Sequence, residues 1–265
     1  MLNFDEMQEV KYMSSCKGNQ TKFYSDGYWY KIDSLNNKEG LAEEFVSKIE
    51  SCIFDFKYVE YKSIEGLYKQ DAVNACCCKN MYSENTQFIT FKDLFRYKGI
   101  PHSVFIKYAD ISDNIESVLE ILYNITGLNL LNYLRDNLFL DALIINEDRH
   151  WMNLGVCYTD DKFHIAPVFD NGSSLFCVDW TYRESKSFDE NIKTAELSAR
   201  PFSKFYDRQV DALLKLGCKP LRININTLYE EMHGYHNVLY DIKQVELAKR
   251  VLLNRLVKYK GKIYV

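Results

Sequence analysis

The residues best suited to chemistry are Asp148, Asn153 and Asp170, each of which follows or borders an apolar segment. The nearly continuous apolar run at residues 138–145 ends abruptly in five polar or charged residues, 146–150. Burying such residues costs desolvation energy and brings no packing gain. A functional loop is therefore predicted directly after the apolar run.

Two short strand-like runs are expected to bring Asn153 and Asp170 together. Residues 154–158 follow Asn153, residues 163–169 lead into Asp170, and the polar sequence between the two runs is typical of a tight turn. Carboxylate and amide oxygens suit a hard divalent cation. The aspartate of the polar loop then remains to receive a proton from a hydroxyl group, which is the arrangement of phosphoryl transfer from a magnesium-bound nucleotide.

The motif Asp148-Arg149-His150-x-x-Asn153, followed by Asp170-Asn171-Gly172, resembles the catalytic and metal-binding loops of HipA-like bacterial serine/threonine protein kinases. The resemblance implies an ATP-dependent kinase that is capable of autophosphorylation and uses ATP and Mg²⁺. It assigns catalysis to Asp148, Arg149 and His150, and metal binding to Asn153 and Asp170. Arg149 is expected to neutralise Asp148 or its surroundings, and His150 to orient the loop.

The same resemblance implies an α+β, two-lobed protein-kinase-like fold. A small, antiparallel, β-rich N-terminal lobe is expected at residues 1–88, and a mainly helical C-terminal lobe at residues 89–265. HipA-like toxins carry an additional subdomain before the phosphate loop, and here that loop begins near residue 14. The chain thus resembles the compact members of the family.

The polar stretch at residues 14–22 is predicted to be a turn between two strands, and it resembles the Gly-x-Gln-x-Lys turn of HipA-like kinases. It lacks the GxGxxG spacing of a glycine-rich loop. Its backbone N–H groups are expected to face the ATP phosphates, and a solvated surface hairpin is the alternative interpretation. The residues assigned to the ATP site here are Gly18, Asn19, Gln20 and Thr21. Ser14 or Ser15 is a candidate for autophosphorylation.

Lys31 is the one charge in the strand-like segment 28–32 and is predicted to hold ATP phosphates. The helical spacing of apolar residues over 41–56 predicts an amphipathic helix. A kinase carries the glutamate that pairs with its strand lysine on a helix at this place. Glu44 is assigned to the ATP site in that role, and the pattern does not distinguish it from Glu43.

Two further strands are predicted at residues 58–64 and 70–80, which would complete the small lobe. The segment after them is expected to connect the lobes and to contact adenine, which assigns Cys78 and Asn80 to the ATP site. This assignment follows from the order of the elements, because those side chains have no special affinity for adenine.

The rest of the chain is predicted to be mainly helical. Helical patterns occur at residues 91–97, 115–123, 128–140, 208–216, 223–232 and 241–259. The pattern at 128–140 is apolar nearly all round, which is typical of a buried helix. Residues 171–204 are predicted to be irregular, and are either a substrate-binding or activation-type segment or a surface loop.

Composition excludes several other classes of protein. The net charge of −4 gives no argument for nucleic acid as a partner, and no apolar run is long enough to insert stably into a membrane. The N-terminus lacks the pattern of a secretory signal. The eight cysteines contain no CxxC pair and fit buried thiols in a reducing cytoplasm, where the protein is expected to act. The expected partner is a protein with an acceptor serine or threonine.

Two other functions remain open at this stage. A small-molecule or phosphoinositide-type lipid kinase has the same catalytic residues, and the order Asp-Arg-His supports it. A catalytically silent pseudokinase is expected to have lost at least one of the four residues that the reaction needs. All four are present: Lys31, Asp148, Asn153 and Asp170.

Overall fold

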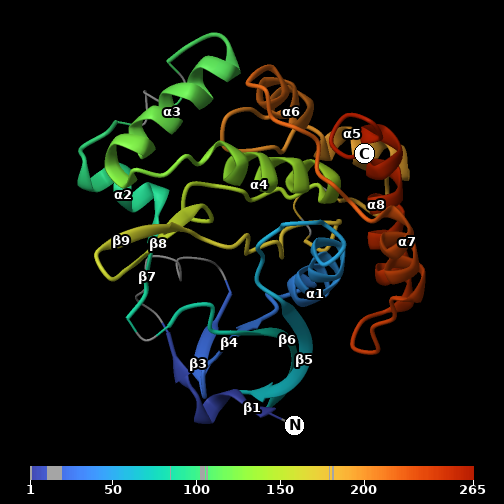
Figure 1. Ribbon diagram of the computed structural model, residues 1–265. Coiled ribbons are helices and arrows are strands. Elements are labelled where there is room, and N and C mark those ends of the chain that lie inside the picture. The colour runs from blue at the N-terminus through green and yellow to red at the C-terminus, as the bar shows by residue number, and fades with distance from the viewer. Residues whose placement is uncertain are drawn as a thin grey trace.

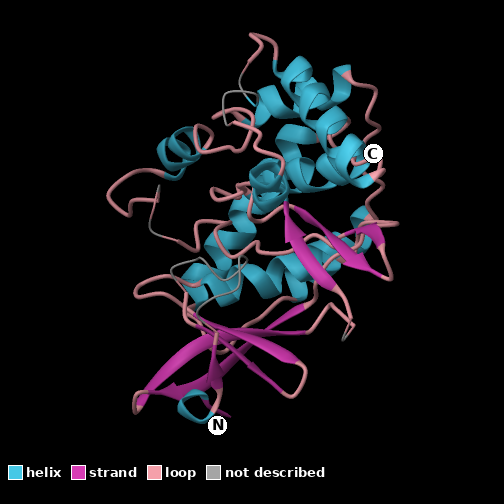
Figure 2. Cartoon of the chain, turned by 90° about the vertical axis from the view of Figure 1, so that its left-hand side faces the viewer, coloured by secondary structure: helices cyan, strands magenta, loops and turns pink. Residues whose placement is uncertain are grey.

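The computed structural model describes residues 2–10, 20–83, 85–101, 105, 107–178, 180 and 182–265. A curled sheet formed by N-terminal strands lies at one end of the molecule, and most of the helices gather at the other end (Figure 1). Figure 2 shows the same separation of strands from helices in a second view. The predicted α+β fold is confirmed.

Six strands form the N-terminal sheet in the order β1-β5-β6-β4-β3-β2. All neighbours are antiparallel except β1 and β5, which are parallel. The two-residue turn between β3 and β4 has left-handed backbone at Asp26 (φ 51°) and Gly27 (φ 80°), as a tight hairpin turn requires. The strands are β1 (Leu2–Asn3), β2 (Gln8–Glu9), β3 (Lys22–Ser25), β4 (Tyr28–Ile32), β5 (Tyr61–Tyr68) and β6 (Asp71–Lys79), and a short 3₁₀ helix, η1 (Phe4–Glu6), follows β1.

Helix α1 (Glu39–Glu50) packs against β5 and β6 of this sheet. It ends at Glu50, earlier than the predicted end at residue 56. The hydroxyl of Ser47 fastens the helix to the sheet, because it accepts a hydrogen bond from the backbone N–H of Tyr61 at 2.9 Å and donates to the carbonyl oxygen of Glu43 at 2.9 Å. The position of Glu43 is thereby linked to β5.

A second sheet of three strands has the order β7-β8-β9, with β7 (Gln87–Thr90), β8 (Gly155–Thr159) and β9 (Lys162–Ile165). Asp160 and Asp161 form the predicted turn between β8 and β9, and both have positive φ. Strand β9 ends at Ile165, so the chain approaches Asp170 in irregular backbone and not in the predicted strand. The predicted lobe boundary at residue 88 falls inside β7, which pairs with β8.

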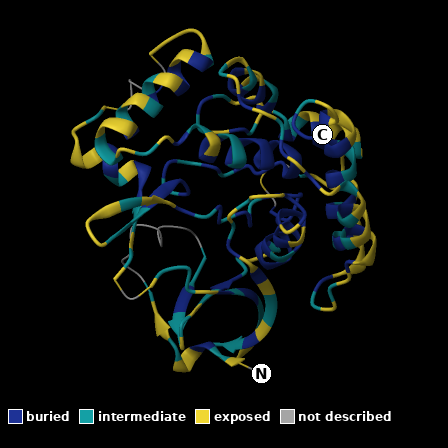
Figure 3. Ribbon diagram, viewed as in Figure 1, coloured by how far each residue is buried: buried dark blue, intermediate teal, exposed yellow. Residues whose placement is uncertain are grey.

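Seven helices follow the N-terminal sheet in the described part of the chain, and α4 is the most deeply buried of them (Figure 3). Helix α5 begins at a capping box between Ser187 and Glu190, inside the stretch predicted to be irregular. No helix of the described residues is long and apolar enough to cross a membrane. The helices are α2 (Phe91–Tyr97), α3 (Ile111–Thr126), α4 (Leu131–Ile144), α5 (Phe188–Ala195), α6 (Tyr206–Lys215), α7 (Ile225–Gly234) and α8 (Ile242–Tyr259).

The N-terminus of α1 is tethered by the Asp33 carboxyl group. One oxygen accepts a hydrogen bond from the backbone N–H of Gly40 at 2.7 Å, and the other accepts from the Tyr240 hydroxyl at 2.8 Å. Burial raises the pKa of Asp33 to about 7, although both hydrogen bonds oppose the rise. The carboxyl group that holds α1 therefore titrates close to neutral pH.

We predict that Asp33 makes the protein less stable as the pH rises from about 4 to 7. In this range the unfolded chain, in which the pKa of an aspartate is about 3.9, loses a proton that the folded chain retains. Asp33→Asn removes this contribution, so the unfolding free energy of the variant relative to the parent should increase with pH across that range. Urea unfolding at intervals between pH 4 and 8 measures the difference, and parallel curves for the two proteins would contradict the prediction.

Candidate active site

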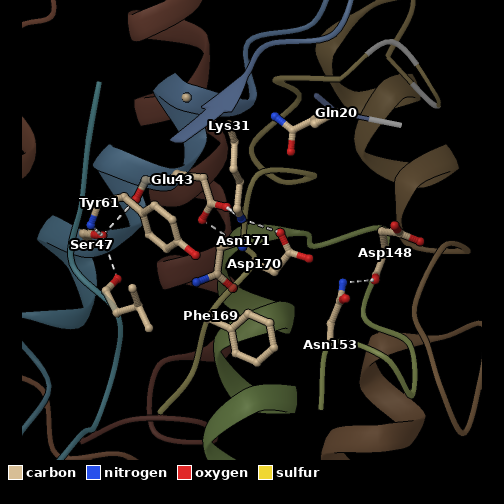
Figure 4. Close-up of polar contacts among 12 residues, drawn as sticks. Gln20, Lys31, Glu43, Ser47, Tyr61, Asp148, Asn153, Phe169, Asp170 and Asn171 are labelled. Atoms are coloured by element: carbon tan, nitrogen blue, oxygen red, sulfur yellow. Dashed lines mark hydrogen bonds and ion pairs between the residues drawn. The ribbon is translucent and has the colours of Figure 1, made fainter. Parts of the chain in front are cut away.

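Lys31 lies on β4 between two carboxylates from distant parts of the chain (Figure 4). Its ammonium group is 2.7 Å from Glu43 Oε1 and 2.7 Å from Asp170 Oδ1. Burial disfavours the charged amine, but the charges of Asp170 and Glu43 outweigh that effect and hold the pKa of Lys31 well above its ordinary value. Lys31 is therefore a buried cation that joins α1 to the segment after β9.

Glu43, and not Glu44, is the glutamate that pairs with Lys31. Its second oxygen accepts a hydrogen bond from the backbone N–H of Asn171 at 2.9 Å. One step along a helix turns a side chain by about 100°, and Glu44 faces away, where it accepts hydrogen bonds from Tyr235 and Asn237. The assignment of Glu44 to the ATP site does not agree with this geometry.

Asp170 is held in left-handed backbone, with a φ of 62°. Aspartate tolerates this conformation better than most residues do. Burial alone would raise the pKa of its carboxyl group, but Lys31 and Lys22 lower it well below the usual range. Asp170 is thus a carboxylate at neutral pH, aimed into the same space as Lys31.

Asp148 and Asn153 lie beside Asp170 (Figure 4). The amide nitrogen of Asn153 donates a hydrogen bond to the carbonyl oxygen of Asp148 at 3.1 Å, which orients the amide. Burial raises the pKa of Asp148, partly offset by His150 and Arg200, and the charge of Asp170 raises it further. The two aspartates are therefore close enough to affect each other electrostatically.

His150 belongs to the same loop and lies near the carboxylate of Asp148. Its Nε2 is 3.7 Å from Asp148 Oδ2, beyond hydrogen-bonding distance. The carbonyl oxygen of His150 accepts a hydrogen bond from the backbone N–H of Asn153 at 2.9 Å. The backbone of His150 thus helps to shape the loop, while its ring faces the carboxylate of Asp148.

Arg149 is not paired directly with Asp148, because its guanidinium group points into the core, but its charge lowers the pKa of Asp148 and of Asp170 from there. It is 0% exposed and forms a two-point ion pair with Asp141 of α4, with Nη2–Oδ1 at 3.0 Å and Nε–Oδ2 at 3.1 Å. It also donates to the carbonyl oxygen of Phe169 at 2.8 Å and to the side-chain oxygen of Asn171 at 2.6 Å. A planar group with five donors can join several segments in this way, so Arg149 positions other residues and is not available to a substrate.

Asn171 and Glu50 belong to the same network. Asn171 is part of the Asp170-Asn171-Gly172 motif but was assigned no role from the sequence, and Glu50 was not identified. The amide nitrogen of Asn171 donates to Glu50 Oε1 at 3.1 Å, while its amide oxygen accepts from Arg149. Burial raises the pKa of Glu50 well above its usual value, although the hydrogen bond from Asn171 and the charge of Arg149 oppose the rise. Its spacing from Glu43, seven residues or two helical turns, is the signal that places both on one face of α1.

A cavity of about 1010 Å³ opens from Lys31 and Asp170 toward the end of β6. Of the predicted connector, Cys78 and Asn80 both line it, although Cys78 belongs to β6 itself. Apolar and aromatic side chains provide most of the wall, among them Trp29, Tyr61, Met81, Phe88 and Phe169. A cavity of this size with a few charged groups at one end is typical of a site for a small ligand.

The predicted phosphate loop is described only at its end. Gly18 and Asn19, with the candidate phosphorylation sites Ser14 and Ser15, lie outside the described residues. Gln20 donates to the carbonyl oxygen of Ile32 at 3.2 Å, and the backbone of Thr21 pairs with the N–H of Ile32. Neither Gln20 nor Thr21 is among the residues that line the cavity.

Lys22 is a second cation of the cavity that sequence reasoning missed. It is directly opposite Lys31 in the β3–β4 register and lines the same wall. Two like charges opposite each other are unfavourable unless anions lie nearby, and the effect of Lys22 on the pKa of Asp170 places it close to that carboxylate. Its position at the end of the Gly-x-Gln-x-Lys turn was the available signal.

The oxygen donors of the site fit Mg²⁺. Asn153 and Asp170 offer an amide and a carboxylate oxygen, and Mg²⁺ commonly binds one or two such groups while phosphates and water complete its shell. In the described part of the chain, no group of three or more His, Cys, Asp or Glu side chains is gathered as a self-sufficient metal site. These donors suit a cation that arrives with a polyphosphate.

We predict that Arg149→Met lowers the unfolding free energy by about 3 to 5 kcal/mol, because it leaves the buried Asp141 carboxylate without its partner. Arg96→Met is the control, since Arg96 pairs with Asp93 at the surface and its side chain is 74% exposed. The control should change the unfolding free energy by no more than about 1 kcal/mol. Urea unfolding measures both effects, and similar losses for the two variants would contradict the buried role of Arg149.

The sequence matches no family model and no curated protein. Solved structures do match. A *Helicobacter pylori* proinflammatory kinase, CtkA, has a TM-score of 0.62 and 20% sequence identity over 99% of this chain and 95% of its own. HipA from *Shewanella oneidensis* MR-1, solved with HipB and operator DNA, has a TM-score of 0.52 and 11% identity over 94% of this chain and 65% of its own.

Identities this low establish the fold alone. CtkA is a proinflammatory kinase and is matched over nearly its whole length, and HipA belongs to a toxin–antitoxin system. The resemblance deduced from residues 148–153 and 170–172 is therefore confirmed at the level of architecture: the chain has the fold of a HipA-like kinase.

Proposed function

We propose that this protein is an ATP-dependent serine/threonine protein kinase that is capable of autophosphorylation. The observation that carries the proposal is the placement of Lys31 between Glu43 and Asp170, each at 2.7 Å, at the charged end of a cavity of about 1010 Å³. Two segments, α1 and the one after β9, converge there on a cation of β4. The similarity of fold to CtkA supports the same class of reaction.

The cavity has two parts, and each suits a different part of a nucleotide. Its apolar wall, which includes Trp29 and Phe169, fits the flat face of a base, and the end of β6 offers backbone groups to the edge of the base. At the opposite end, Lys31 and Lys22 present positive charge to the phosphates. Asn153 and Asp170 would hold Mg²⁺, which supplies neutralisation of the charge that develops on the phosphates.

Asp148 receives the proton of the acceptor hydroxyl group. The acceptor oxygen forms a bond to the γ-phosphorus while the bond from that phosphorus to the bridging oxygen breaks, and the electron pair leaves with ADP. The hydroxyl proton of the acceptor passes to the Asp148 carboxylate. Most of the rate enhancement in such a transfer comes from positioning and charge stabilisation, which this arrangement of fixed charges would provide.

We predict that the parent chain gains the mass of one or more phosphates during incubation with MgATP, and that Asp148→Asn does not. The substitution keeps the size of the side chain and removes the group that accepts the proton. Intact-mass spectrometry measures the gain, followed by peptide mapping to locate the modified hydroxyl. If the protein stays unmodified and instead labels phosphoinositides or small alcohols, the acceptor class is that of a lipid or small-molecule kinase.

We predict that Glu43→Gln raises the KM for ATP or lowers kcat about 10- to 100-fold, and that Glu44→Gln has no more than about a twofold effect. A charge-assisted hydrogen bond contributes about 1.5 to 3 kcal/mol. Of the two glutamates, only Glu43 accepts such a bond from Lys31. The two variants differ by one position on α1, so they control for general effects on the helix. Steady-state assays with ATP distinguish them, and equal losses would contradict the pairing.

A further inference from the structure

Arg200 forms an ion pair with Asp148 that the sequence pattern did not indicate. Its Nη1 is 3.0 Å from Asp148 Oδ1. The two residues are 52 positions apart, and Arg200 lies in the loop between α5 and α6. Its side chain is 54% exposed and that of Asp148 is 28% exposed, so the pair lies at the open side of the site.

The backbone around Arg200 is fixed from two directions. Gln209 of α6, which is 0% exposed, donates its side-chain amide to the carbonyl oxygen of Arg200 at 3.1 Å and accepts from the N–H of Phe202 at 2.9 Å. The ring of Phe202 packs edge-on against Trp151 of the catalytic loop, with centroids 5.1 Å apart. The guanidinium group therefore extends toward Asp148 from an anchored loop.

An ion pair this exposed contributes little to stability, so its main effect is on the geometry of Asp148. Three contacts surround that residue: Asn153 holds its carbonyl oxygen, Arg200 holds Oδ1, and the His150 ring lies 3.7 Å from Oδ2. With Oδ1 engaged by Arg200, the rotation of the carboxylate is restricted. Oδ2 is then the oxygen presented to an incoming hydroxyl.

We propose that Arg200 is a positioning residue, which orients the Asp148 carboxylate toward the acceptor hydroxyl. The inference rests on the proposed kinase function. In the transfer step the acceptor proton passes to Oδ2 as the acceptor oxygen bonds to the γ-phosphorus and the bond to the ADP oxygen breaks. Arg200 contacts neither ATP nor the metal in this scheme, so its loss affects turnover and leaves nucleotide binding intact.

The test compares Arg200→Ala and Arg200→Lys with the parent chain in phosphoryl-transfer assays. Because small displacements of a reacting group can cost about 100-fold in rate, we expect Arg200→Ala to lower kcat about 10- to 100-fold. The KM for ATP should stay within about twofold. Arg200→Lys should recover part of kcat, and guanidinium ion added at millimolar concentration should partly rescue Arg200→Ala. Arg208→Ala is the control, since Arg208 lies on α6 and stacks on Phe205.

The outcomes separate the two proposals. Parent-level kcat in Arg200→Ala, or a loss that neither lysine nor guanidinium relieves, would overturn the role of Arg200 and leave the kinase function standing. Nitrogen-15 NMR of the arginine side chains tests the contact without any activity, because Asp148→Asn should shift the Arg200 signal. An inactive parent chain that still shows this shift would overturn the proposed function, and the positioning role with it. An unshifted signal would show that the contact is absent.

Discussion

A single buried charge determines where the segments that carry the candidate site lie. The guanidinium group of Arg149 is removed from solvent, and burying such a charge is tolerable only if acceptors surround it. The acceptors come from α4, through Asp141, and from the segment after β9, through Phe169 and Asn171. Asp148 precedes Arg149 and Asp170 follows Phe169, so the requirement to satisfy one cation fixes the backbone on both sides of the candidate site.

Asn171 extends this constraint to the N-terminal sheet. Its amide oxygen accepts from Arg149, its amide nitrogen donates to Glu50, and its backbone N–H donates to Glu43. Glu43 in turn binds Lys31 of β4. A continuous chain of hydrogen bonds therefore runs from α4 through Arg149 and Asn171 to α1 and the sheet. A displacement of α1 would break contacts in both parts of the molecule, which explains why Asp33 and Ser47 also fasten this helix.

The features predictable from sequence were those with local causes. The turns at Asp26-Gly27 and Asp160-Asp161 follow from residues that tolerate positive φ, and the buried α4 follows from its apolar composition. The start of α5 carried a local signal too, the Ser187-x-x-Glu190 capping box, which the polar composition around it obscured.

Other features depend on distant contacts that no local pattern contains. Helical spacing alone did not separate Glu43 from Glu44, because the choice is made by Lys31 and Asn171 on one side and by Tyr235 on the other. The role of Arg149 depends on Asp141, the lone charge in an otherwise apolar run. That isolated charge was a signal, since a buried carboxylate needs a partner. The sequence contained no comparable signal for the contact of Arg200 with Asp148.

Burial differs across the candidate site. Arg149 is 0% exposed and Lys31 is 7% exposed, while the side chains of Asp148 and Arg200 are 28% and 54% exposed. The fold itself is shared with CtkA, whose sequence is only 20% identical. The exposed side of the site is built from a loop, where substitutions disturb little packing. Under the proposed function, the buried groups serve phosphoryl transfer, and the loop between α5 and α6 is where selection of the acceptor can vary.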